Sequence, residues 1–179
     1  VGALIAAGLL PLLLAAFAFA AIVAIIDALN PFGGDGDGSW AGRWPASEEI
    51  PAVYRPMYEA AAAHYGVNQF LLASIHKQET DFSRHPAARS GTNEVGAAGP
   101  MQFQLPTWRS HHTAFRAIDK HRPAEYPLDR RSLPSCDGVA ENAGCVYDDF
   151  DAIAGAAHKL KADGADRDLD SAGTRRAVC

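Results

Sequence analysis

The chain has 179 residues, 16 Lys or Arg against 21 Asp or Glu, and a formal net charge of -5. Once its apolar leading segment is set aside, this length holds about one domain. The mild acidic excess, without a basic stripe, argues against a nucleic-acid-binding protein, because such proteins gather Lys and Arg on one face to neutralise phosphates.

An apolar stretch without charged side chains, Val1–Ile26, opens the chain. It is longer than the roughly 20 residues that a helix needs to cross a bilayer, and longer than the ~7–15-residue core of a signal peptide. We therefore predict a transmembrane helix, or uncleaved signal anchor, over 1–29. A cleaved signal peptide is the alternative, because the small-x-small pattern AFA occurs at 16–18 and again at 18–20.

A segment rich in Gly, Asp and Pro, 30–46, follows the apolar stretch. Such a segment buries too little apolar surface to order itself, so we predict a flexible linker. Acidic residues follow the apolar stretch, and no Lys or Arg precedes Arg43. By the positive-inside rule, the protein is predicted to be a single-pass membrane protein whose domain lies outside the cytoplasm.

The remainder, 47–179, is predicted to be one mainly α-helical domain, truncated at its C-terminal end because the chain stops within a helical pattern. Apolar residues recur at helical spacing between cap and stop residues, and no segment shows a strand alternation. The predicted helices run from about 51 to 65 with Gly66 as the stop, from Asn68 to Glu79, onward from Pro106, and from Asp148 or Asp149 to the residues before Gly164.

A region rich in Arg, Pro and Asp, 119–147, separates the last two helices and is predicted to be a surface insertion. Cys136 and Cys145 bracket a short polar loop in it, and a disulfide between them would suit an oxidising compartment. Cys179 is then left for a partner outside the given sequence. The alternative is three free thiols.

Three histidines lie close together in the sequence near the start of this region, at positions 111, 112 and 121. They fall on a helix end and a loop without the fixed spacing of metal ligands. We predict no metal site and no cofactor.

Glu79 is the first candidate for chemistry. Because Leu71, Ile75 and Glu79 are spaced by four, a helix turns this carboxyl toward its apolar side. Burial, and a place near the negative end of the helix dipole, would raise its pKa so that it stays protonated and serves as a general acid. The alternative is an exposed glutamate at a frayed helix end, paired with Lys77 or Arg84.

The stretch GAAGPMQF, 96–103, is the second candidate, since its glycines allow tight turns or close backbone approach. With Glu79-Thr80 before it and Pro106-Thr107-Trp108 after it, this stretch resembles the motifs of the lytic transglycosylase family, which has a goose-type lysozyme-like fold. The segment 148–165 is similar to a later helix of that family.

The resemblance implies a lysozyme-like helical domain, behind the N-terminal transmembrane helix, that cleaves the bond between N-acetylmuramic acid and N-acetylglucosamine in peptidoglycan. It implies that Glu79 is catalytic and that Met101 and Gln102 line the cleft. Neither nearby acidic residue, Asp81 or Glu94, is well placed as the second carboxylate that ordinary glycosidases use. The resemblance implies that the substrate's own N-acetyl oxygen acts instead, after which the muramic 6-hydroxyl closes a 1,6-anhydro ring.

Two departures from the family pattern bear on the site. Asn93 stands where the family serine usually lies, and Ser90 lies further back, so either one, or neither, binds the acetamido group. The family's Tyr-Asn pair, which closes the cleft near the end of the domain, is absent from the given sequence, and a downstream peptidase domain is compatible with what is present.

The predicted function is therefore that of a membrane-anchored lytic transglycosylase. Its expected partners are peptidoglycan strands and, through the N-terminal helix, the membrane. Two alternatives remain: a muramidase that delivers water in place of the 6-hydroxyl, and a non-catalytic peptidoglycan-binding scaffold of a membrane assembly.

Overall fold

The computed structural model describes Trp44 and residues 49–124, 133–140 and 142–178. This part of the chain is mainly helical, as predicted, and the only strands within it are two short ones. Its α-helices are α2 (Arg55–Tyr65), α3 (Gln69–Thr80), α4 (Leu105–His111), α5 (Asp149–Ala162) and α6 (Ala172–Val178). Short 3-10 turns lie at Ala52–Tyr54, Pro86–Ala88, Ala114–Ala117, Asp119–His121 and Pro134–Cys136.

Within the described ranges, no helix combines the length and the apolar character needed to cross a bilayer. The membrane span predicted over 1–29 lies outside these ranges, and so does the predicted linker apart from Trp44.

The predicted helix boundaries around α2 and α3 are confirmed. Gly66 ends α2 in a left-handed conformation, with φ at 69°, and its N–H donates to the carbonyl of Ala62. Asn68 begins α3, because its side-chain oxygen accepts hydrogen bonds from the N–H groups of Phe70 and Leu71. Asp148 is the residue that caps α5, where its side chain accepts from the N–H of Asp151.

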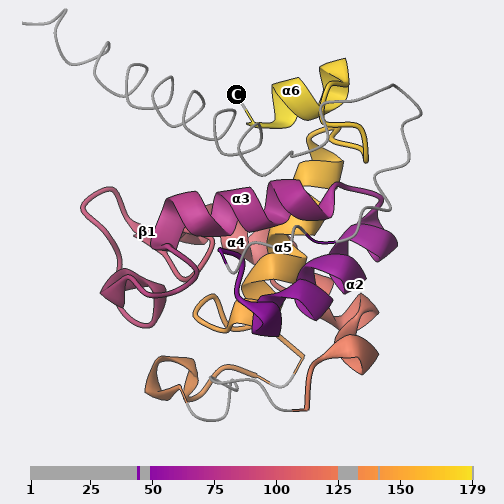
Figure 1. The fold of residues 1–179 in the computed structure, drawn as a ribbon. Helices are drawn as coiled ribbons and strands as arrows, with labels where there is room; N and C mark the ends of the chain where they lie inside the picture. The colour runs from indigo at the N-terminus through magenta and orange to yellow at the C-terminus, as the bar shows by residue number, and fades with distance from the viewer. Residues whose placement is uncertain (1–43, 45–48, 125–132, 141, 179) are drawn as a thin grey trace, which may run out of the picture.

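Helix α5 is the centre of the fold and packs against α2, α3, α4 and α6. Figure 1 shows it passing behind α3, with α2 and α6 toward its two ends. Most of its length is buried and made of small residues, which lets neighbouring helices come close. A Cβ on Gly155 would lie 2.6 Å from the ring of Trp108, so glycine is what allows α4 to pack at this point.

A two-stranded antiparallel hairpin was not predicted. Strand β1 (Ala97–Ala98) pairs with β2 (Phe103–Gln104), so the GAAGPMQF stretch forms the hairpin and its turn. Strands of two residues are too short to show an alternation of apolar and polar side chains, which is why the sequence gives no signal for them.

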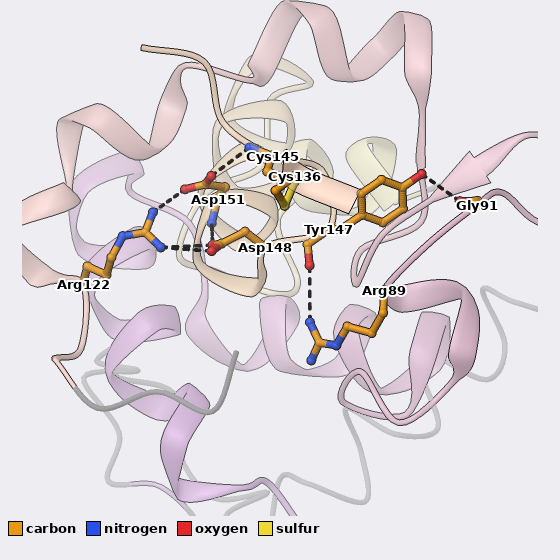
Figure 2. The surroundings of a disulfide bond; sticks show 8 residues. All are labelled: Arg89, Gly91, Arg122, Cys136, Cys145, Tyr147, Asp148 and Asp151. Carbon is orange, nitrogen blue, oxygen red and sulfur yellow. Dashed lines mark hydrogen bonds and ion pairs between the residues drawn. A yellow bond between two sulfur atoms is a disulfide. The ribbon is translucent and has the colours of Figure 1, made fainter. Parts of the chain in front are cut away.

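Most described residues of the region predicted as a surface insertion are exposed or half-buried, but a few of them are buried and tie it to the domain. Cys136 and Cys145 form a disulfide, with their Cα atoms 5.6 Å apart, and both pack against the buried Leu133. Arg122 lies between two buried carboxylates, with nitrogen-to-oxygen distances of 3.1 Å to Asp148 and 2.5 Å to Asp151 (Figure 2).

Figure 2 also shows how this region is tied to the rest of the domain. Asp151 accepts a hydrogen bond from the backbone N–H of Cys145 at 2.8 Å. Arg89 donates to the carbonyl of Tyr147 at 3.3 Å, and the Tyr147 hydroxyl donates to the carbonyl of Gly91 at 3.0 Å. These contacts hold the start of α5 against the loop that leads into the hairpin.

Candidate active site

The C-terminal end of α3 is joined directly to the hairpin turn by Thr80. Its buried hydroxyl donates to the carbonyl of Pro100 at 2.7 Å and accepts from the N–H of Ser83 at 3.2 Å. Because Thr80 follows Glu79 in the chain, this contact sets the distance between the candidate catalytic carboxyl and the GAAGPMQF turn.

Three consecutive residues after Thr80 adopt left-handed backbone conformations. Asp81, Phe82 and Ser83 have φ angles of 48°, 54° and 64°, although none of them is glycine. Such conformations cost on the order of 1–3 kcal/mol each and persist only where the surroundings hold them. Here the Phe82 side chain is buried in the core, and the Tyr54 hydroxyl donates to its carbonyl at 3.3 Å. The strained turn ends α3 abruptly, one residue after Glu79-Thr80.

A buried chain of hydrogen bonds anchors the same turn. The Ser83 hydroxyl lies 2.5 Å from a carboxylate oxygen of Asp149, whose other oxygen accepts from Arg89 at 3.0 Å. Since Ser83 must donate to the carboxylate, it accepts from Nε2 of His76 at 2.7 Å, which leaves His76 Nδ1 to accept from the Tyr58 hydroxyl at 2.7 Å.

Burial lowers the pKa of His76 to about 3, so its ring stays neutral and keeps these donor and acceptor roles. Because Ser83 donates to the carboxylate and not to the imidazole, it is not arranged as a nucleophile. The chain of hydrogen bonds is a brace between α2, α3, the strained turn and α5.

A cleft of about 280 Å³ opens beside the end of α3. It brings together three residues that the sequence analysis singled out, namely Glu79, Met101 and Gln102. The remaining lining comes from α3, the hairpin, α4, α5 and α6: Ile75, Phe103, Gln104, Thr107, Ala156, Lys159, Leu160, Ala177 and Val178.

The Glu79 side chain is exposed, as in the alternative given above, and it lies on the open side of this cleft. The protein walls nevertheless replace much of the surrounding water, and this desolvation raises the pKa of Glu79 from 4.5 to about 7. Among the described residues, Glu79 has no hydrogen-bond or ion-pair partner. The alternative pairing is not observed, because Lys77 lies 2.6 Å from Glu49, and Arg84 lies 3.3 Å from Asp81.

Asn93 serves the hairpin, and it is not among the residues that line the cleft. Its side-chain oxygen accepts from the N–H groups of Val95 and Ala97, at 3.0 and 2.9 Å, and its nitrogen donates to Gln102 at 2.9 Å. Gln102 in turn donates to the carbonyl of Gly99 at 2.8 Å and has a positive φ of 46°. Asn93 therefore orients Gln102 in the cleft wall.

Ser90, the other candidate for the acetamido group, is exposed and also lies outside the cleft lining. The same holds for the two carboxylates considered as partners of Glu79, since Asp81 and Glu94 are exposed and do not line the cleft. In the described ranges, no group of three or more His, Cys, Asp or Glu side chains is placed to hold a metal ion.

A larger hollow, of about 550 Å³, lies between α2 and the 3-10 turns near Ala117 and His121. None of the predicted catalytic or binding residues lines it. The smaller cleft is the better candidate for an active site, because it contains the carboxyl with a raised pKa and the adjacent hairpin.

Comparison with protein-family models, with curated proteins and with solved structures finds no match for this chain. We therefore infer a function from the motifs of the sequence and from the geometry of the cleft.

Several residues of the site were not predicted from the sequence. Thr80 was noted only as part of a motif, although it makes the contact that joins α3 to the hairpin. Lys159, Ala177 and Val178 come into the cleft from the last two helices, far along the chain from Glu79. In the sequence, the signal for this part of α5 was the resemblance of the segment 148–165 to a later helix of the family.

The pH dependence of activity should report the state of Glu79. If this carboxyl is the general acid, it must be protonated in the free enzyme, so kcat/KM should fall as the pH rises through about 7. The expected slope above the pKa is about tenfold per pH unit. Initial rates of wall lysis measured from the ordinary pKa of glutamate, 4.5, to well above 7 would check this. A rate that already falls as the pH rises through 4.5 would contradict the prediction.

Proposed function

We propose that this chain is a membrane-anchored peptidoglycan lytic transglycosylase whose lysozyme-like helical domain lies outside the cytoplasm and uses Glu79 as its single acid and base. The observation that carries the proposal is the position of Glu79, an unpaired carboxyl in a cleft beside the GAAGPMQF hairpin. The motifs quoted above connect this arrangement with the family.

The chemistry would proceed in two steps. Protonated Glu79 donates its proton to the oxygen of the glycosidic bond, while the N-acetyl oxygen of the muramic acid attacks the anomeric carbon and the bond to the leaving sugar breaks. The Glu79 carboxylate then takes the proton of the muramic 6-hydroxyl, whose oxygen displaces the N-acetyl oxygen and closes the 1,6-anhydro ring. Glu79 ends protonated, and no water is consumed.

Three features of the cleft support this mechanism. A pKa of about 7 lets Glu79 act as an acid and then as a base near neutral pH. The cleft lining in the described ranges contains no second carboxylate, which agrees with a nucleophile supplied by the substrate. Gln102 presents a polar side chain beside Glu79 and is oriented by Asn93.

A muramidase is the second candidate, favoured by the access of solvent to Glu79 from the open cleft. Water would then replace the 6-hydroxyl, with the same glutamate as acid and base. A non-catalytic wall-binding scaffold is the third, but a binding module has no need of an unpaired carboxyl whose pKa is raised by desolvation.

The products of purified peptidoglycan distinguish these functions. The full chain, solubilised in detergent, is incubated with peptidoglycan and the released muropeptides are analysed by mass spectrometry. Products lighter by one water than the hydrolytic products are expected. Reducing ends would make the protein a muramidase, and wall binding without release by the wild type would overturn the enzymatic proposal in favour of the scaffold.

A further inference from the structure

Within the part of the chain that the structure describes, two ionisable side chains line the cleft, Glu79 from α3 and Lys159 from α5. The other lining residues are apolar, amide or hydroxyl side chains, so they present no second charge to a ligand. The proposed mechanism uses Glu79 and gives Lys159 no part.

The two charged groups enter the cleft from different helices and do not pair with each other in the described ranges. Lys159 comes from the face of α5 that also contributes Ala156 and Leu160 to the lining, and its ion-pair partner is Asp163. Burial raises the pKa of Glu79.

Lys159 is available to a ligand in the cleft. Its partner is Asp163, one turn further along α5, and both side chains are partly exposed. An exposed ion pair of this kind is weak, because water screens the charges and two mobile side chains must be held together. The nearby His111 and His158 hydrogen-bond to each other, with their Nδ1 atoms 3.0 Å apart, and a histidine carries no negative charge with which to neutralise the ammonium group.

We propose that Lys159 binds a carboxylate on the lactyl branch of the muramic acid, while Glu79 acts on the glycosidic bond in the same cleft. This inference rests on the proposed function. The sugar rings of the glycan carry no charge, whereas the lactyl branch carries one or more carboxylates. In a bare strand the lactyl group itself is the carboxylate, and in a peptide-bearing strand the carboxylates belong to the stem peptide.

The inference is tested by binding to the inactive Glu79→Gln form of the full chain, so that no ligand is consumed. The three ligands are a tetrasaccharide of N-acetylglucosamine, a muramic-acid-containing tetrasaccharide with free lactyl groups, and the same tetrasaccharide bearing stem peptides. Dissociation constants are measured by calorimetry at low salt. One charged hydrogen bond should make a carboxylate ligand bind about tenfold more tightly than the neutral one.

Lys159→Met, added to Glu79→Gln, should remove that difference, because methionine keeps the apolar stem and loses the charge. Lys161→Met is the matched control, since Lys161 lies on the same helix, is exposed and does not line the cleft. In the active enzyme, Lys159→Met should raise KM for carboxylate-bearing strands and leave kcat nearly unchanged.

The outcomes separate the two carboxylate sources and the two proposals. Tighter binding of the free lactyl tetrasaccharide assigns Lys159 to the lactyl group, and tighter binding of the peptide-bearing form alone assigns it to the stem peptide. A preference that survives Lys159→Met, or that is absent from the start, overturns the inference. If wild-type lysis is intact in that case, the proposed function stands without it.

Discussion

Glu79→Gln should lower the rate of peptidoglycan cleavage by about 10²–10⁴-fold, the usual contribution of a general acid or base. Glutamine has nearly the same shape as glutamate but can neither donate a proton to the glycosidic oxygen nor accept one from the 6-hydroxyl. The loss should appear in kcat, because the proton transfers occur in the transition state and binding of the strand does not require them. Turbidity of a wall suspension and the yield of anhydro-muropeptides would both report it.

The same substitution should not unfold the protein. Glu79 has no hydrogen-bond or ion-pair partner among the described residues. Its raised pKa means that the ionised carboxyl is less favourable in the folded state than in the unfolded state. Between the ordinary pKa of 4.5 and about 7, the folded state binds more protons than the unfolded state, so its stability falls as the pH rises. Glu79→Gln should remove this fall and leave the variant slightly more stable than the wild type above pH 7.

Glu94→Gln is the matched control for activity. Glu94 is an exposed carboxyl on the loop before the hairpin and does not line the cleft, so its loss should change the rate by less than about twofold. A large effect at Glu94, or near-normal lysis by Glu79→Gln, would contradict the single-glutamate mechanism.

Gly99→Ala should cost about 3 kcal/mol of folding free energy, combining overpacking with the strain of a left-handed alanine. Gly99 has a φ of 77°, and a Cβ built on it would lie 1.8 Å from the carbonyl oxygen of Val146. That oxygen belongs to the main chain, so it cannot rotate away as a flexible side chain would. The hairpin and the segment before α5 would have to separate.

Gly96→Ala is the control for backbone conformation alone. The φ of Gly96, 82°, is as unfavourable for alanine as the φ of Gly99. The nearest atom to the added Cβ would, however, be the Gln104 side-chain oxygen at 3.6 Å. The expected cost is therefore about 1–2 kcal/mol, from the left-handed conformation without a clash. Urea unfolding midpoints of the two variants would measure the difference, and equal costs would show that close packing against Val146 is not what requires Gly99.

Gly99→Ala should also impair activity in the fraction that remains folded. The Gly99 carbonyl accepts hydrogen bonds from both the backbone and the side chain of Gln102, at 3.1 and 2.8 Å. A shift of the hairpin would move Met101 and Gln102 away from Glu79 in the cleft.

The helices of the described part and most of their ends could be predicted because they depend on residues close together in the chain. Asn68 caps α3 through the N–H groups two and three positions further on, and Gly66 ends α2 through a carbonyl four positions back. Such signals are local, so they persist in the sequence whatever the tertiary fold.

The hairpin and the strained turn could not be predicted in the same way. Three left-handed residues in a row, Asp81 to Ser83, contradict their own conformational preferences and are held by Tyr54, His76 and Asp149 from other elements. Asn93 had been a candidate for the acetamido group, and its three hydrogen bonds to the hairpin became visible only with the fold.

The sequence by itself determined the helical class of the described domain, the residues that begin and end its main helices, and the candidate pairing of Glu79 with GAAGPMQF. Only the tertiary structure decided that Glu79 is unpaired and desolvated, that Lys159 and the last helix share its cleft, and that Cys136 and Cys145 are joined. The reason is that desolvation and the shape of the cleft depend on many residues that are distant in the chain, from Ile75 to Val178. The ends of a helix depend on residues that are close together in the chain.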